Sequence, residues 1–307
     1  MTTDEILRRW SASRGEPAWL ASRRSDALAR LSGLYEDGLA ELRRALDEET
    51  GRLLPVAPEL IAQGVEALPL EEAASRGDAP SWWPDAGTTT LDAIVEAFWT
   101  GGYFIRVPHG VKAELPLHVA AGLKRFGRVE KSVVLLEEES SLELVEGCTE
   151  LGGGEGGRWS VVDVRVGPRA SLEAASVQAW SGGVVSRALK RAYVAGEGRL
   201  EWTDANLWAA RVEKTIEARL EGGARADILC GGYAGAGESQ RLVVLALPPG
   251  RAQVRILAAG EVEGLGGVCE HWAGGEAASL HGFFEPLARR LPLEFSVEFT
   301  RLLAAVL

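Results

Sequence analysis

The stretch WSVVDVRV-GPRA-SLE, residues 159–173, decides the fold. Residues 159–166 form an apolar, β-branched run typical of a strand, and residues 167–170 carry the glycine and proline of a turn. A second strand then opens with a small, an apolar and a polar residue. This unit recurs along the chain, and the apolar residue after each turn is Leu142, Leu172, Leu200, Ala226 or Ala252, at separations of 30, 28, 26 and 26 residues.

Two strands in every 26–30 residues are typical of a solenoid, in which each rung stacks on its neighbours to bury its apolar face. The alternative is an antiparallel sandwich with strands at closer spacing. We expect the solenoid, with glycine or proline at its corners.

Glycine marks the limits of this body. Of 37 glycines, 7 precede residue 101, 30 lie between Gly101 and Gly282, and none follows. Helical spacing of apolar residues predicts helices before residue 100, and again over 283–291 and 293–307. We therefore predict a helical region (1–100), a β-solenoid core (101–282) and a helical segment (283–307).

Composition excludes several classes of protein. The 307 residues carry 33 basic and 44 acidic side chains, a net charge of −11, which argues against nucleic-acid binding. No apolar run is long enough to cross a membrane, and the acidic start Met1–Glu5 is unlike a secretory signal. The cysteines, Cys148, Cys230 and Cys269, are odd in number and widely spaced, so we expect free thiols in the cytoplasm.

Four segments, in this order, resemble the SufB/SufD family of the SUF iron–sulfur cluster assembly machinery. They are GEPAWL with the arginines that follow it (15–24), AFWTGGYFIRVPHGV (97–111), VEGCT (145–149), and Glu270-His271 with FFEPLARRL (283–291). The resemblance covers nearly the whole chain. The segment after His271 departs from the family pattern and little follows Arg290, so we expect a short, divergent member.

The resemblance implies a right-handed parallel β-helix between helical ends, and a non-catalytic scaffold role. It also implies a transient iron–sulfur cluster, a SufC-like ABC ATPase that docks on the C-terminal helices, and a dimer with itself or with a sister SufB/SufD chain. For docking, Phe295, Phe299, Leu302 and Leu303 lie on one face of the last segment. The same stripe would equally serve to cap the solenoid end.

Cys148 is the candidate sulfur acceptor, because a thiolate can carry persulfide sulfur or bind iron. Its neighbours Glu146 and Glu150 should raise its pKa and oppose reactivity. A buried, inert cysteine in a rung is the alternative. Cys230, before two glycines, is expected to be such a core thiol.

Cys269, Glu270 and His271 are the candidate metal ligands, since all three side-chain types can bind iron. On a strand, Cys269 and His271 would point to one face and Glu270 to the other. We therefore expect Cys269 and His271 to need a ligand from a partner chain. Alternatively, His271 is an ordinary hydrogen-bonded strand residue.

Two other functions compete with the scaffold. One is an interaction module that binds the ATPase but has lost its cluster site. The other is an enzyme acting on anionic polysaccharide along a solenoid face, which five lysines in the whole chain make a poor fit.

Overall fold

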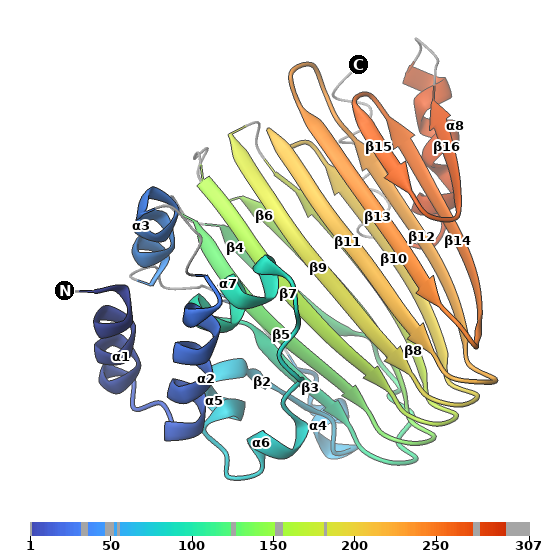
Figure 1. The fold of residues 1–307 in the computed structure, drawn as a ribbon. Helices are drawn as coiled ribbons and strands as arrows, with labels where there is room; N and C mark the ends of the chain where they lie inside the picture. Colours follow the sequence, from blue (N-terminus) through green and yellow to red (C-terminus); the bar gives the residue numbers. More distant parts are fainter. Residues whose placement is uncertain are drawn as a thin grey trace.

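The computed structural model describes residues 2–31, 36–46, 52–53, 56–123, 127–150, 156–180, 183–272 and 277–292. Its centre is a β-solenoid of two facing eight-stranded sheets, with helices packed at both ends of the chain (Figure 1). The predicted fold class, mainly β with a parallel solenoid between helical segments, is confirmed.

The elements follow one another as the repeat predicts. The helices are α1 (Thr3–Ser13), α2 (Ala18–Ala29), α3 (Glu36–Ala45), α4 (Pro58–Ala62), α5 (Leu70–Ala74), α6 (Ala79–Trp82), α7 (Thr90–Phe98) and α8 (Ala277–Ala288). Sheet A contains, in spatial order, β1 (Arg52–Leu53), β4 (Leu117–Leu123), β6 (Ser141–Glu150), β8 (Ser171–Ala179), β10 (Arg199–Leu207), β12 (Arg225–Tyr233), β14 (Arg251–Ala259) and β16 (Val268–Trp272). Sheet B contains β2 (Glu66–Pro69), β3 (Tyr103–Val107), β5 (Arg128–Leu136), β7 (Gly156–Val166), β9 (Val184–Val194), β11 (Arg211–Leu220), β13 (Ser239–Leu247) and β15 (Val262–Leu265).

The repeat predicted from the sequence is the register of sheet A. The residues that follow successive turns pair as Cα neighbours in parallel strands, and they are Leu142, Leu172, Leu200, Ala226 and Ala252. The first four are buried in the solenoid interior. Pairing is parallel throughout both sheets except where β1 meets β4 and β2 meets β3.

Glycine is less essential at the corners than its abundance indicates. In four stacked turns, the left-handed position is occupied by Glu139, Arg169, Glu197 and Gly223, with φ of 58°, 56°, 61° and 87°. Only one of the four is glycine, although this conformation disfavours other residues. Each turn hydrogen-bonds to the next, as when Glu139 N donates to Pro168 O at 2.9 Å. The hydrogen bonds between stacked turns stabilise the left-handed conformation at these non-glycine residues, which an isolated turn would disfavour.

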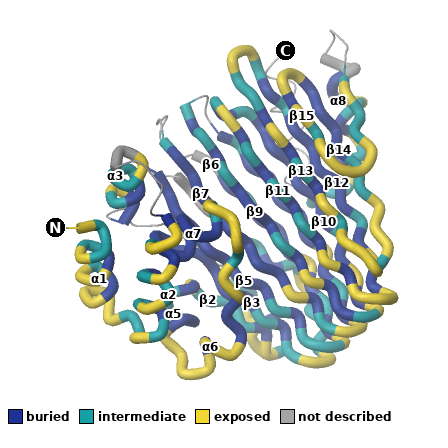
Figure 2. The backbone as a smooth tube through the Cα atoms, in the orientation of Figure 1, coloured by how far each residue is buried: buried dark blue, intermediate teal, exposed yellow. Residues whose placement is uncertain are grey.

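Three apolar clusters hold the layers together. The first fills the solenoid between the sheets, and the second joins the N-terminal helices to the outer face of sheet B. The third lies between α8 and the outer face of sheet A, where Phe284 and Leu287 pack on Leu229 and Leu257. Both outer faces are therefore partly covered by helices, and exposed residues lie mainly at the turns of the solenoid and on the N-terminal helices (Figure 2).

Arg24 joins the N-terminal GEPAWL element to the solenoid. Its side chain is 1% exposed; Nε and Nη2 each donate to Glu16 at 2.8 Å, and Nη1 and Nη2 donate to the carbonyls of Ala97 and Trp99. The guanidinium also stacks on the rings of Trp10 and Trp99. Residues 15–24 are thus held against the end of α7 by the buried Arg24 side chain, and we call these contacts of Arg24 with Glu16, Ala97 and Trp99 the N-terminal clamp.

The C-terminal helix α8 begins at Ala277, before the last glycine, and passes through Gly282. A glycine inside a helix costs only about 1 kcal/mol, so the end of the glycine-rich stretch is not the start of the helix. Phe295, Phe299, Leu302 and Leu303 lie outside the described residues. Within the ranges given above, no helix has the length and apolarity needed to span a membrane.

Candidate functional site

All three cysteines project from the inner face of sheet A. One inward-facing row, followed from strand to strand, reads Glu146, Ser176, Asp204, Cys230, Ile256, Cys269. The next row, two residues further along each strand, reads Cys148, Gln178, Asn206, Gly232, Ala258, His271. Cys148, Cys269 and His271 therefore face the same interior.

These two rows also keep the candidates apart. Five strand intervals separate Cys148 on β6 from His271 on β16. At about 4.8 Å per interval, the separation is roughly 24 Å. Cys148 and His271 thus cannot bind the same ion.

Cys148 is 3% exposed and borders both the apolar core and a charged cluster. Burial is the main reason why its pKa is raised to about 12, and Glu146 adds to the effect while Arg158 opposes it. Arg158 Nη2 lies 4.0 Å from the sulfur. The predicted direction of the shift is confirmed, and the isolated chain holds Cys148 as a protonated thiol at neutral pH.

Several buried polar groups on the inner face carry unused hydrogen-bonding capacity. Within the described part of the chain, both amide atoms of Gln178, the indole nitrogen of Trp180 and the hydroxyl of Ser186 have no hydrogen-bond partner. Gln178 is the Cα neighbour of Cys148, and Trp180 stacks under Arg158, which is also the Cα neighbour of Ser186. Buried polar groups normally find partners, so this part of the interior suits a small polar or anionic group.

A buried ionic network includes two members of the first inward-facing row, Glu146 and Asp204. Asp204 is fully buried, and its carboxylate lies 2.7 Å from Lys190 Nζ and 2.6 Å from Lys214 Nζ. Lys190 also reaches Glu146 at 3.3 Å. Burial opposes ionisation of Asp204, but the two ammonium groups outweigh it and hold its pKa well below the usual range.

This network was not predicted from the sequence. Alternation within a strand shows which residues share a face, but here both faces carry apolar residues, so the inward face could not be identified. The signal available was the recurrence of polar residues at matching positions in successive repeats: Ser176, Asp204 and Cys230 are neighbours in register.

Cys269 and His271 lie side by side on β16, the edge strand of sheet A. Cys269 Sγ and His271 Nε2 are 3.5 Å apart, Cys269 is partly exposed and His271 is exposed. Glu270 points to the opposite face and binds Arg255 at 2.9 Å. The structure brings two of the three predicted ligands together, with Glu270 apart from them as the strand parity predicts.

A metal site of three or more His, Cys, Asp and Glu side chains is not found among the residues that the structure describes. Cys269 and His271 stay predicted ligands that need others. Cys230 is fully buried, and burial is the main reason why its pKa is raised, in keeping with the expected core thiol.

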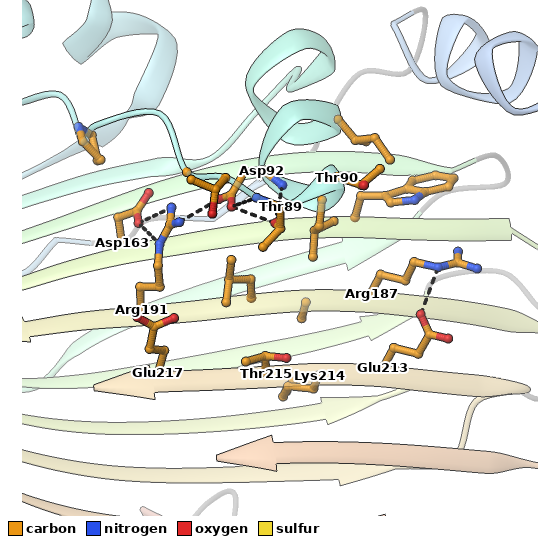
Figure 3. Close-up of a pocket in the computed structure, with 18 of the residues that line it drawn as sticks. Thr89, Thr90, Asp92, Asp163, Arg187, Arg191, Glu213, Lys214, Thr215 and Glu217 are labelled. Atoms are coloured by element: carbon orange, nitrogen blue, oxygen red, sulfur yellow. Dashed lines mark hydrogen bonds and ion pairs between the residues drawn. The ribbon is translucent and has the colours of Figure 1, made fainter. Parts of the chain in front are cut away.

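A groove of about 1140 Å³ lies between the loop before α7 and the outer face of β7, β9, β11 and β13 (Figure 3). Arg191 crosses it, 2.8 Å from Asp92 of α7 and 2.8 Å from Asp163 of β7. Arg187 pairs with Glu213 at 3.3 Å. The Arg191 ion pairs therefore link the helical region to sheet B across the groove. Because these charges neutralise one another, we assign the groove no ligand.

Fold and site together define the class: a parallel β-solenoid with thiol and imidazole groups on its inner face. Comparison with known proteins finds one family that the central part of the chain resembles. Residues 118–244, which span β5 to β12 and parts of the strands on either side, match the family model described as SUF system FeS cluster assembly, SufBD core domain.

Curated relatives agree with this match. Proteins named iron-sulfur cluster assembly SufBD family protein from Staphylococcus epidermidis and Staphylococcus aureus are each 32% identical over 159 residues, and one from Staphylococcus saprophyticus is 31% identical. Each match covers 50% of this chain and 34% of the relative, so it spans about a third of the relatives' length. The family model and these relatives together support a SufB/SufD family member, over the part of the chain that they match.

Proposed function

We propose that the chain is a non-catalytic scaffold subunit of a SUF-type assembly complex in the cytoplasm, which holds a transient iron–sulfur cluster and works with a SufC-like ABC ATPase. Family membership supports a role in iron–sulfur cluster assembly. The single observation that carries the proposal is the Cys269–His271 pair, 3.5 Å apart on the inner face of the last strand of the solenoid.

Thiolate and imidazole are suitable ligands for an iron–sulfur cluster. Two ligands leave a cluster under-coordinated, so a second chain must supply the others. The position of β16 supports this, because it is the edge strand of sheet A and no described strand pairs beyond it. We propose that a second copy or a sister SufB/SufD chain meets this end of the solenoid.

Cys148 is the proposed sulfur acceptor. Its support is the pair of polar neighbours with unused hydrogen-bonding capacity, Gln178 and Trp180, together with Arg158 at 4.0 Å. An anionic sulfur at Cys148 would use such donors, whereas a neutral thiol does not. Because burial raises the pKa of Cys148, we propose that the partner complex opens the interior before sulfur is accepted.

The second candidate is an interaction module that binds the ATPase without a cluster. The observation that favours it is that, of the described residues, no three potential ligands converge. The two candidate functions differ in cluster binding. The interaction module acquires no cluster, with or without partners, and it still binds the ATPase when every cysteine is replaced, whereas the scaffold acquires a cluster in the complex.

Co-purification followed by anaerobic reconstitution separates them. The chain is expressed with its cognate ATPase and sister chain, and the complex is incubated with ferrous iron and sulfide. The scaffold proposal expects a stable complex and a visible cluster absorbance. A stable complex without that absorbance assigns the chain to the interaction module, and the absence of any complex contradicts both.

A further inference from the structure

The outer face of sheet A carries a row that lacks acidic residues. Its members occupy matching positions beside the turns on six successive rungs, and each side chain can donate a hydrogen bond. In order they are Lys112, Ser141, Ser171, Arg199, Arg225 and Arg251. In a chain with net charge −11, this is a notable local concentration of donors.

The three arginines of this row are exposed, and among the described residues none of them makes an ion pair or a side-chain hydrogen bond. Arginines elsewhere on the solenoid do pair with a carboxylate two residues away. Arg211 lies 2.6 Å from Glu213, and Arg219 lies 2.6 Å from Glu217.

Arg290, just beyond α8, explains the difference. Glu201 and Asp227 are the carboxylates two residues beyond Arg199 and Arg225, on the same face of the sheet. Arg290 binds Asp227 through two hydrogen bonds of 3.0 Å and approaches Glu201 at 3.8 Å. Arg290 therefore engages the carboxylates beside Arg199 and Arg225, and the residue two positions beyond Arg251 is the uncharged Gln253. The same outward row continues with Glu143 and Glu173, which lie beside the two serines.

Like charges placed directly opposite each other on neighbouring strands are destabilising. Here three arginines occupy matching positions on neighbouring strands, which lie about 4.8 Å apart, and none of the three offers the others a compensating charge. A row of this kind is electrostatically complementary to a line of carboxylates of similar spacing.

We propose that this arginine row, Arg199, Arg225 and Arg251, is a docking surface for the acidic face of an α-helix of a partner protein. Acidic residues three or four positions apart on a helix lie about 5–6 Å apart, close to the interval of the row. An extended segment presents same-face side chains about 6.7 Å apart, which falls out of step with the arginines. The overall negative charge disfavours a nucleic acid at the same place.

The test uses the full chain and a fluorescent helical peptide of about 20 residues with glutamates along one face. A peptide of equal composition with its glutamates scattered, and a single-stranded oligothymidylate of similar length, serve as comparisons. Binding is measured by fluorescence anisotropy at low and at physiological salt. The triple variants R199E/R225E/R251E and, as a milder change, R199Q/R225Q/R251Q are compared with the control R9E/R165E/R241E, which alters three exposed arginines on other faces.

We expect the striped peptide to bind the wild-type chain and to bind either row variant at least about tenfold more weakly, with the control changed less than about twofold. Circular dichroism should show that the variants keep the β-solenoid. The proposal is overturned if the wild-type chain does not bind the striped peptide. Equal binding of the scattered peptide, tighter binding of the oligothymidylate, or equal loss in the row and control variants would also overturn it.

Discussion

Cys148 and His271 lie in the same inward-facing row of sheet A, separated by five strand intervals. One is enclosed by the core and the other sits on the exposed edge strand. The thiol proposed to accept sulfur and the imidazole proposed to bind iron therefore belong to different environments on one continuous wall. The same contrast separates the buried thiols, Cys148 and Cys230, from the partly exposed Cys269.

The first prediction concerns thiol reactivity. In the folded chain, iodoacetamide at pH 8 should modify Cys269 and leave Cys148 and Cys230 protected, with rates that differ by roughly a hundredfold or more. The reason is that burial raises the pKa of Cys148 to about 12, whereas Cys269 is partly exposed. Mass spectrometry of tryptic peptides measures the three rates, with the urea-unfolded chain as control. Modification of Cys148 as fast as Cys269 would show that the interior is open in the isolated chain.

The second prediction concerns the buried network. Asp204→Ala leaves the ammonium groups of Lys190 and Lys214 buried without their shared carboxylate. Breaking a buried ion pair in this way should lower the free energy of unfolding by about 3–5 kcal/mol. Urea denaturation measures the change. A loss below about 1 kcal/mol would mean that water or a rearranged partner compensates the two lysines.

The network also shows where sequence reasoning stops. The spacing of Leu142, Leu172 and Leu200 predicted the register, because each rung must present an apolar residue at the same position. The same reasoning could not predict that Asp204 is buried in the solenoid interior, since a charged residue in an alternating strand is usually solvated. It is buried because two lysines from sheet B meet it across the interior, and contacts between facing sheets leave no trace in the spacing along one strand.

The third prediction is a pH dependence of stability. Burial opposes ionisation of Glu96, but Lys131 and Arg23 outweigh it and lower its pKa to about 2, against 4.5 for the ordinary group. Because the folded pKa is depressed, the stabilisation is fully present above about pH 4.5 and is lost as pH falls towards 2. The contribution at neutral pH is on the order of 3 kcal/mol.

The Glu96→Gln variant tests this assignment. Its stability at pH 7 should be lower than that of the wild-type chain, and the difference should shrink steadily when urea unfolding is repeated from pH 5 down to pH 3. Glu41→Gln, which removes the charge of a partly exposed carboxyl on α3, serves as the control. A difference that stays constant with pH would contradict the proposed ionic origin.

The fourth prediction concerns the N-terminal clamp. Arg24→Lys should destabilise the attachment of α1 and α2 by about 3 kcal/mol, even though the charge is kept. Lysine cannot reproduce the two bonds to Glu16 together with those to the carbonyls of Ala97 and Trp99. Limited proteolysis should then cleave near residues 14–17 faster than in the wild-type chain, with Arg9→Lys as the exposed control. Equal cleavage rates would show that the clamp is not what holds the helices.

The most direct test of the scaffold account is cluster formation in the complex with ATPase and sister chain, compared between Cys269→Ser and Cys230→Ser. Both substitutions remove one thiol from the same inward row, so they are matched in chemistry and differ in position. Absorbance after anaerobic reconstitution should be lost or strongly reduced in Cys269→Ser and retained in Cys230→Ser. Wild-type absorbance in Cys269→Ser would contradict a cluster bound at the exposed edge of the solenoid.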